Sequence, residues 1–273
     1  MNDSLALRFL YRTSCGRVFL KFLVRPWVSR AAGSFLAGRF SKPLIRPFVL
    51  KNRISMDDVL VPAGGFASFN DFFIRKRKIV FSTECHDRLI SPCDGRLSRV
   101  PLRGETFLAV KRSTYTLTDL LDDAELAKSF EGGEALVFRL MPVDYHRYAY
   151  PADAAIVASK RIDGVLHCVR PIALGAYPVF IQNYREYQVL ETEKFGRMVQ
   201  MEVGALFVGR ITNHPRTDGN GKVAAGEEKG YFEFGGSTII LLREKNAPPL
   251  SESIRTGTED GAELYVRIGE PLA

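Results

Sequence analysis

From about Leu89 onward the sequence is a series of short β-rich runs separated by turn signals, and this pattern constrains the fold most strongly. It predicts a mainly β domain of the sandwich or barrel type. One helical stretch interrupts the pattern at 118–130, with Thr118 as its candidate N-cap, and a long polar, glycine-rich loop is predicted at 213–229. The predicted strands are 95–100, 135–140, 155–158, 187–191, 198–208, 231–234 and 239–242.

The first 60 residues have a different pattern, which predicts helices broken at proline and glycine. Residues 1–53 hold eleven of the 38 Lys and Arg but one of the 31 acids, so this segment carries +10 and the rest carries −3. Apolar and aromatic side chains are mixed with these charges at helical spacing. We therefore predict an α+β chain, in which residues 1–60 form basic amphipathic helices and residues 61–273 form the mainly β domain.

The basic helical segment is predicted to dock on a membrane surface. It contains neither the roughly 18–20 consecutive apolar residues of a spanning helix nor the apolar core of a signal peptide. Basic and aromatic residues in one helix suit the headgroup region, where each Lys or Arg contributes about 1 kcal/mol near an anionic leaflet. The alternatives are packing on the chain's own domain, a mitochondrial transit peptide, and nucleic-acid binding, which is least favoured because no recognised motif accompanies the charge.

The cysteines indicate reduced thiols and no metal site. Cys15, Cys85, Cys93 and Cys168 form no CxxC pair, and they show no zinc-ligand spacing with the four histidines.

Three short segments carry the residues that point to chemistry. They are Ser-Pro-Cys-Asp-Gly at 91–95, Pro-Val-Asp-Tyr-His-Arg-Tyr-Ala-Tyr-Pro at 142–151, and the segment 230–238, in which Gly235-Gly236 precede Ser237. The simplest interpretation of the third segment is a glycine kink or β-bulge. A hydrolase nucleophile elbow is disfavoured, because the pattern is not GxSxG and no strand-to-helix change follows.

A second hypothesis is that the chain cleaves itself at this point. Glycine allows unusual backbone geometry and leaves its carbonyl carbon open to the hydroxyl of Ser237. Attack there would convert the Gly236–Ser237 amide into an ester, and elimination followed by reaction with water would leave a pyruvoyl group. The hydroxyl needs a base and a group that holds the base, for which Asp94 and a histidine are the candidates.

Together the three segments resemble the phosphatidylserine decarboxylase family, in the same order and with similar separations. The resemblance covers roughly residues 65–273 and includes 183–189, 195–209 and 267–272. It implies a lyase of the short bacterial type, made as a proenzyme that cleaves itself between Gly236 and Ser237. Decarboxylation of phosphatidylserine to phosphatidylethanolamine would then run through a Schiff base to the pyruvoyl group formed from Ser237.

The resemblance also implies roles for single residues. Ser237 would be the nucleophile of self-cleavage and the pyruvoyl precursor, and Asp94 would be the acid of an Asp-His-Ser triad. His146 would assist decarboxylation as a proton donor or by orienting the carboxylate. His167 and Cys168 are candidates for contacts with the substrate head group, although ordinary strand residues are the simpler interpretation of this pair.

The chain departs from the family pattern at Ala149. The family has His-Arg-x-His-x-Pro, whereas this chain has His146-Arg147-Tyr148-Ala149-Tyr150-Pro151, so Ala149 stands where the triad histidine is expected. Alanine has no proton acceptor, and we therefore predict an unprocessed chain in which self-cleavage is impaired. Either the histidine has been replaced by engineering, or this is a natural member that uses His146 as its base.

The expected partners follow from the resemblance and from the basic segment. They are phosphatidylserine, an anionic membrane surface on the cytoplasmic face of a bacterial inner membrane, and a second copy of the chain in a homodimer; no nucleic acid is expected. Two alternatives remain open: a pyruvoyl-dependent decarboxylase of a soluble amino acid derivative, and a non-enzymatic β module with a membrane-binding arm.

Overall fold

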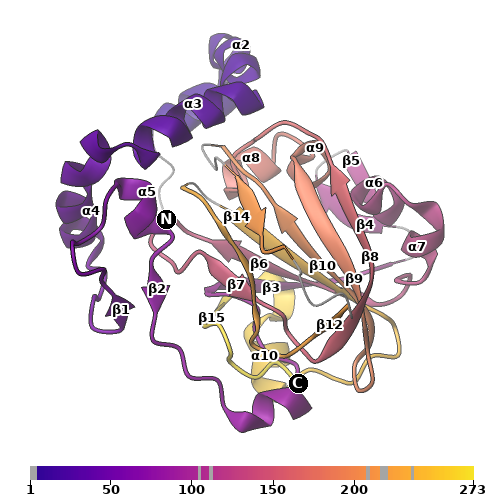
Figure 1. Ribbon diagram of the computed structural model, residues 1–273. Helices are drawn as coiled ribbons and strands as arrows, with labels where there is room; N and C mark the ends of the chain where they lie inside the picture. Colours follow the sequence, from indigo (N-terminus) through magenta and orange to yellow (C-terminus); the bar gives the residue numbers. More distant parts are fainter. Residues whose placement is uncertain (1–4, 104–105, 111–112, 207–209, 216–220, 235–236) are drawn as a thin grey trace.

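The computed structural model describes residues 5–103, 106–110, 113–206, 210–215, 221–234 and 237–273. A helical N-terminal segment lies on one side of a domain built around a large sheet (Figure 1). The N-terminal segment comprises α1 (Leu5–Arg12), α2 (Ser14–Leu23), α3 (Pro26–Ala37), η1 (Arg39–Leu44), α4 (Ile45–Asn52), β1 (Val59–Leu60), α5 (Phe69–Phe73) and β2 (Lys76–Arg77).

The large sheet has eight antiparallel strands in the order β12-β8-β9-β10-β14-β6-β3-β15. The strands that are central in space are β10, β14 and β6, although they are far apart in the chain. The strand bounds are β3 (Gly95–Pro101), β6 (Glu134–Leu140), β8 (Ala154–Ile162), β9 (Arg185–Thr192), β10 (Gly196–Val203), β12 (Lys222–Val223), β14 (Ser237–Arg243) and β15 (Leu264–Val266).

Both faces of the central strands are buried, which explains the unbroken apolar run in β14. Ile239 and Leu241 pack into the core on one face, and Ile240 and Leu242 pack into a second core on the other. Successive side chains of a strand point to opposite faces, so a strand covered on both sides needs apolar residues at every position.

A different layer covers each face of the large sheet. One face is covered by a small sheet in the order β11-β13-β7, and the rings of Tyr148 and Phe232 from this sheet lie 4.8 Å apart in the core. The other face is covered by helices that bury Leu117, Leu120 and Phe130. The elements of these layers and of the connections are β7 (Arg147–Ala149), β11 (Ile211–Asn213), β13 (Glu228–Phe232), α6 (Leu117–Leu121), α7 (Ala124–Lys128), α8 (Pro171–Leu174), α9 (Val179–Gln182), β4 (Thr106–Val110), β5 (Ser113–Thr116), η2 (Thr83–Asp87), α10 (Glu252–Gly257) and η3 (Glu259–Gly261).

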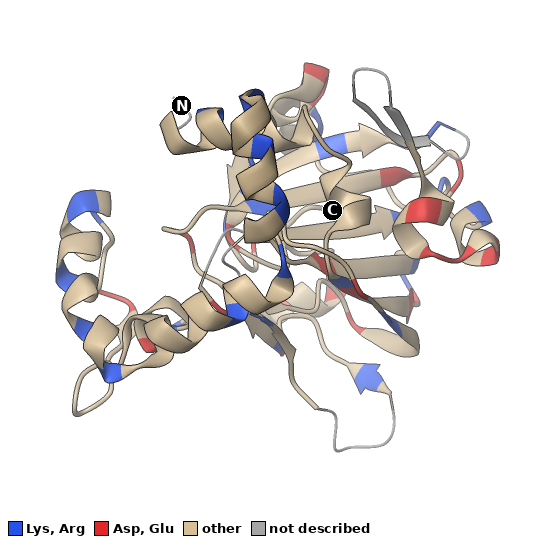
Figure 2. Ribbon diagram, turned by 90° about the horizontal axis from the view of Figure 1, so that it is seen from above, with Lys and Arg blue, Asp and Glu red and all other residues tan. Residues whose placement is uncertain are grey.

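The N-terminal helices are only partly covered by the domain. Tyr11, Leu20 and Val24 are buried in its core, so packing on the chain's own domain accounts for part of the amphipathic pattern. Basic residues recur along α1 to α4, which contain no acid (Figure 2). No helix among the described residues is long and apolar enough to cross a bilayer. The exposed apolar side chains of these helices are Leu5, Phe9, Val18, Phe19, Phe22, Trp27, Phe35, Phe40, Leu44 and Leu50.

The predicted α+β architecture is confirmed, and each predicted strand overlaps a strand of the structure. Two local predictions were wrong. The N-cap of the helix after β5 is Thr116, in a capping box with Asp119, and not Thr118. The segment 213–229, predicted as a loop, contains β12 and the start of β13, because both strands find partners far away in the chain.

Candidate active site

The segments that carry Ser237 and Asp94 meet at one end of the large sheet. Ser237 begins β14 and pairs with Leu140, the last residue of β6. On the other side of β6, Arg96 of β3 pairs with Arg139, so continuing this antiparallel register places Gly95 opposite Leu140. Neighbouring strands lie about 4.8 Å apart, which leaves roughly 10 Å between the backbones at Ser237 and Gly95.

Ser237 is fully buried at the start of its strand. Among the described residues, its hydroxyl has no hydrogen-bond partner. A buried hydroxyl without a partner destabilises a fold by about 1–3 kcal/mol, so each such group calls for an explanation. Gly235 and Gly236 lie outside the described residues, and so does the peptide bond at which cleavage is predicted.

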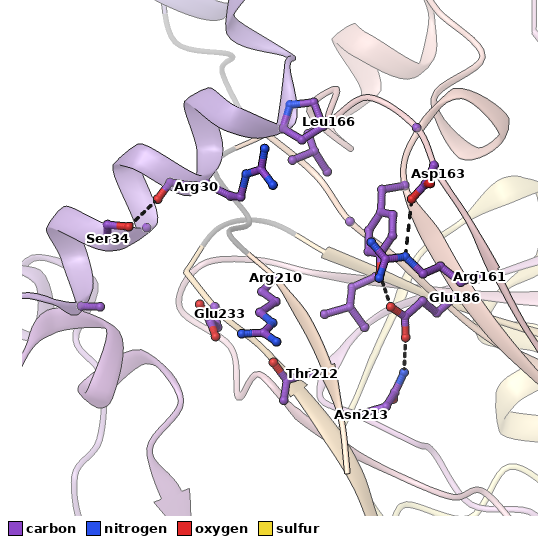
Figure 3. A pocket seen from close by; sticks show the side chains of 17 residues that line it. Arg30, Ser34, Arg161, Asp163, Leu166, Glu186, Arg210, Thr212, Asn213 and Glu233 are labelled. Atoms are coloured by element: carbon purple, nitrogen blue, oxygen red, sulfur yellow. Dashed lines mark hydrogen bonds and ion pairs between the residues drawn. The ribbon is translucent and has the colours of Figure 1, made fainter. Parts of the chain in front are cut away.

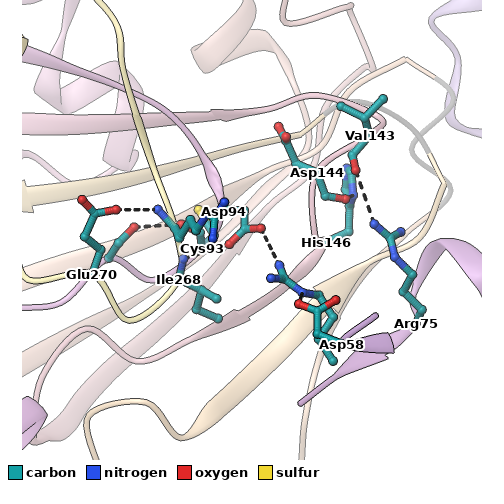
Figure 4. A network of polar contacts seen from close by, with 12 residues as sticks. Asp58, Arg75, Cys93, Asp94, Val143, Asp144, His146, Ile268 and Glu270 are labelled. Atoms are coloured by element: carbon teal, nitrogen blue, oxygen red, sulfur yellow. Dashed lines mark hydrogen bonds and ion pairs between the residues drawn. The ribbon is translucent and has the colours of Figure 1, made fainter. Parts of the chain in front are cut away.

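Asp94 is held by two contacts that fix both carboxylate oxygens. Its Oδ2 accepts a hydrogen bond of 2.7 Å from Nη1 of Arg77, and its Oδ1 accepts one of 2.9 Å from the backbone N–H of Ile268 (Figure 4). Arg77 also contacts Asp58, at 2.6 Å. The buried carboxylate is therefore oriented by a cation from the N-terminal segment and by the C-terminal segment at once.

His146 lies in the connection from β6 to β7, which crosses the same end of the sheet. The ring is fully buried, and Nδ1 lies 2.9 Å from the carbonyl oxygen of Asp144. A carbonyl oxygen can only accept, so in the neutral ring Nδ1 carries the proton and Nε2 is the basic nitrogen. The ring of Phe73 lies 4.0 Å away between centroids and limits the movement of the imidazole.

Ala149 lies beside the segment that carries Asp94. Its backbone N–H donates to the carbonyl of Pro92 at 2.8 Å, and its carbonyl accepts from the side chain of Gln200 at 3.1 Å. The residue is buried, and its side chain offers only a methyl group. The tertiary structure thus brings position 149 and the Ser91–Gly95 segment together, although more than 50 residues separate them in the sequence.

Burial also changes the acidity of two groups near Asp94. It raises the pKa of Asp144, and the nearby charge of Asp94 adds to this effect, whereas a hydrogen bond from the backbone of Met141 opposes it. The pKa of the Cys93 thiol is raised well above its ordinary value, first by burial and then by Asp94. Cys93 is therefore a neutral, packed thiol at neutral pH and not a nucleophile.

A small apolar cavity of about 180 Å³ adjoins Ser237 through Leu140 and Phe234. Both residues flank Ser237, the first across the strand pair and the second along the chain. The complete lining is Leu7, Arg139, Leu140, Met141, Pro142, Cys168, Val169, Arg170, Ala205, Leu206 and Phe234.

A larger cavity of about 880 Å³ lies between α3 and the sheet domain, and its lining includes Arg30, Arg161 and Arg210 (Figure 3). None of Asp94, His146 and Ser237 lines this larger cavity. None of the three lines the smaller cavity either, but two residues that flank Ser237, Leu140 and Phe234, do, which makes the smaller cavity the better candidate for the reacting end of a substrate.

Comparison with known proteins agrees with this geometry. The family model of phosphatidylserine decarboxylase matches residues 68–273, the range that contains all three segments. The chain belongs to the phosphatidylserine decarboxylase family. Its sequence is 39% identical over 271 residues to phosphatidylserine decarboxylase proenzyme 2 of Clostridium acetobutylicum, an alignment that covers 97% of this chain and 90% of the relative.

Other members of the phosphatidylserine decarboxylase family match over the same extent. The proenzyme of Fusobacterium nucleatum is 38% identical, over 97% of this chain and 89% of the relative. The proenzyme of Chlamydia muridarum is 36% identical, over 98% of this chain and 90% of the relative. The predictions of the family, of a lyase and of a proenzyme are confirmed.

The structure separates the two residues proposed for head-group contacts. His167 is stacked at 4.5 Å on the ring of Tyr177, and its Nδ1 lies 3.4 Å from the hydroxyl of Tyr11 in α1. Burial lowers the pKa of His167 to about 4. Cys168 instead lines the small cavity next to Ser237. The histidine thus joins the N-terminal helix to the decarboxylase domain, while the cysteine faces the candidate site.

Sequence reasoning did not identify Arg75 and Arg77 as residues of this site. Both belong to the basic run 75–78, which was visible in the sequence, but a run of like charges is usually a solvated surface. In the structure Arg77 reaches Asp94, and Arg75 reaches the carbonyl of Val143 next to the His146 segment (Figure 4). Only the tertiary contacts distinguish these two arginines from the surface cations beside them.

Proposed function

We propose that this chain is a phosphatidylserine decarboxylase proenzyme, which forms a pyruvoyl group from Ser237 and converts phosphatidylserine to phosphatidylethanolamine. The observation that carries the proposal is the buried hydroxyl of Ser237. Among the described residues this hydroxyl has no partner, and it lies at the sheet end to which the Asp94 segment also comes.

Self-cleavage is proposed to begin at this hydroxyl. Oγ of Ser237 attacks the carbonyl carbon of Gly236, its proton passes to a base, and the amide becomes an ester as the C–N bond breaks. Loss of the α-proton of Ser237 then breaks the Cβ–Oγ bond, which releases the carboxylate of Gly236 and leaves dehydroalanine at the new N-terminus. Addition of water and loss of ammonia give the pyruvoyl group.

This chain lacks a basic side chain at position 149, where the family resemblance places the histidine of the triad. A histidine at position 149 would stand beside the Pro92–Asp94 segment, because the backbone of residue 149 bonds to Pro92. Asp94 is oriented by two contacts and is suited to hold such a histidine. We infer that Ala149 impairs cleavage and that His146, whose Nε2 is basic in the neutral ring, is the alternative base.

The environment of Ser237 fits a pyruvoyl group and the proposed substrate. The pyruvoyl group supplies an electron sink for the decarboxylation. Leu140 and Phe234 make the adjoining cavity apolar, which favours the loss of a charged carboxylate as neutral CO₂. His146 is proposed to deliver the proton that replaces the carboxylate from Nε2, after this nitrogen has taken up a proton, because Asp144 and Phe73 hold its ring in one orientation.

The N-terminal helices support a lipid substrate. They expose large apolar side chains, among them Phe19, Phe22 and Trp27, next to basic residues and without any acid in α1 to α4. We propose that this surface docks peripherally on the anionic, cytoplasmic face of the membrane, so that the head group reaches the site while the acyl chains stay near the bilayer. A homodimer remains an expectation from the family resemblance.

The decisive test is the substitution Ala149→His. The variant is expected to separate into two chains, 1–236 and 237–273, and the shorter chain of 37 residues (273 − 236) should carry a pyruvoyl group by mass spectrometry. Ala149→His/Ser237→Ala is the matched control and should stay intact. An uncleaved Ala149→His chain in the presence of membranes would refute the proposal, whereas cleavage of the unaltered chain would identify His146 as the base.

A further inference from the structure

Arg75 is a buried cation whose donors are mostly unused. The residue follows α5 and is 5% exposed. Its Nη2 donates one hydrogen bond, of 3.3 Å, to the carbonyl of Val143 (Figure 4). Its Nε and Nη1 are shielded from solvent; within the part of the chain that the structure describes, they have no hydrogen-bond partner and no carboxylate lies within ion-pair distance.

The neighbouring groups compensate only part of this charge. Asp58 and Asp94 form their ion pairs with Arg77 and not with Arg75. Burial and then repulsion by Arg77 lower the pKa of Arg75, and the attraction of Asp94 and Asp58 offsets this only in part. The ring of Phe72 lies 4.9 Å below the guanidinium, but a ring face cannot satisfy its N–H donors. An unpaired buried cation is strongly unfavourable, so its presence next to a site points to an anion supplied from outside the chain.

The position of Arg75 connects this unsatisfied charge with the reacting groups. Phe73, two residues earlier, stacks on His146 and also packs against Phe234 at 5.0 Å. Asn70 of the same helix accepts the backbone N–H of Phe234 at 3.0 Å. The helix that positions Arg75 therefore contacts both the proposed proton donor and the chain that leads into Ser237.

We propose that Arg75 binds the phosphodiester of the substrate head group, an inference that rests on the proposed function. The head group has two anionic groups, and only one of them keeps its charge through the reaction. A cation on the carboxylate would stabilise the reactant against loss of CO₂ and slow the step, whereas a cation on the phosphodiester binds reactant and transition state alike. A guanidinium is suited to phosphate because it offers several donors in a fixed plane.

The kinetic test uses the self-cleaving Ala149→His protein with and without Arg75→Gln. Loss of the charge should raise KM for a short-chain phosphatidylserine about 10- to 100-fold, as expected for charge-assisted hydrogen bonds, with little change in kcat. The kcat/KM for an O-alkyl serine, which lacks the phosphate, should not change. Arg75→Lys should recover part of the affinity, and Arg161→Gln, in the larger cavity, should leave both substrates unaffected.

Two further measurements do not depend on decarboxylation. Calorimetry with glycerophosphoserine and the uncleaved chain should show at least tenfold weaker binding after Arg75→Gln. The melting temperature of Arg75→Gln should stay the same or rise, because an uncompensated buried charge has been removed; a purely structural arginine would lower it.

The outcomes separate this inference from the proposed function. Failure of Ala149→His to cleave refutes the proposed function, while the binding and melting measurements still test Arg75. Three results with Arg75→Gln would each overturn the phosphodiester assignment. They are an equal loss of kcat/KM for phosphatidylserine and for the O-alkyl serine, slower self-cleavage without a change in KM, and unchanged binding of glycerophosphoserine.

Discussion

The buried ion pair between Lys229 and Glu202 is predicted to hold the two sheets together. Nζ of Lys229, on β13 of the small sheet, lies 2.6 and 2.5 Å from the carboxylate oxygens of Glu202, on β10 of the large sheet. Both side chains are 0% exposed. Burial raises the pKa of Glu202 and lowers that of Lys229, and the attraction between the two charges opposes both changes. Neither charge has access to water that could replace its partner.

The expected size of the effect follows from this burial. Lys229→Met leaves a carboxylate in the core without its counter-charge, which should lower the free energy of unfolding by about 3–5 kcal/mol. Lys229→Met/Glu202→Met removes both charges and should recover most of that loss, or exceed the stability of the unaltered chain. The exposed pair of Lys128 and Glu125 is the matched control, and Lys128→Met should cost less than about 1 kcal/mol.

Urea denaturation of the uncleaved chain at pH 7, with tryptophan fluorescence and circular dichroism as probes, would measure these differences. Lys229→Met, Glu202→Met and the double variant complete a thermodynamic cycle that isolates the coupling between the two residues. A loss below about 1 kcal/mol for Lys229→Met would refute the reasoning, and so would a double variant that is as unstable as the single one.

Two further predictions concern His167 and the exposed N-terminal helices. Because burial lowers the pKa of His167 from 6.5 to about 4, its ring is neutral when folded but protonates below pH 6.5 when unfolded, so stability falls as pH drops through this window. The loss attributable to His167 between pH 7.5 and 5 is about 2 kcal/mol, and an identical pH dependence in His167→Gln would contradict it. Phe22→Ser/Trp27→Ser should reduce flotation with anionic vesicles, whereas Val80→Ser, an exposed apolar position outside the helices, should not; equal flotation would exclude docking through this surface.

Local patterns in the sequence were sufficient for the elements and for the motifs. Short β-rich runs and turn signals determined the strands around Leu136, Val189 and Ile240, because a strand's pattern reflects which of its faces are covered. The segments around Asp94, His146 and Ser237 identified the family, because their residues, order and separations together match its pattern. The basic composition of the first 53 residues, with a single acid, likewise predicted helices with a charged surface.

The tertiary structure alone decided which of these parts meet. The small strand β12 exists because Lys222 pairs with Ala155, about 70 residues earlier in the chain. The local sequence pattern does not indicate such a distant partner. His167 is buried because Tyr11 packs over it from the N-terminal helix. Arg75 and Lys76 are adjacent in one basic run, yet Arg75 is buried and contacts the carbonyl of Val143, whereas Lys76 is exposed. Local sequence sets what a residue can do, whereas long-range packing sets which groups it faces and whether water reaches it.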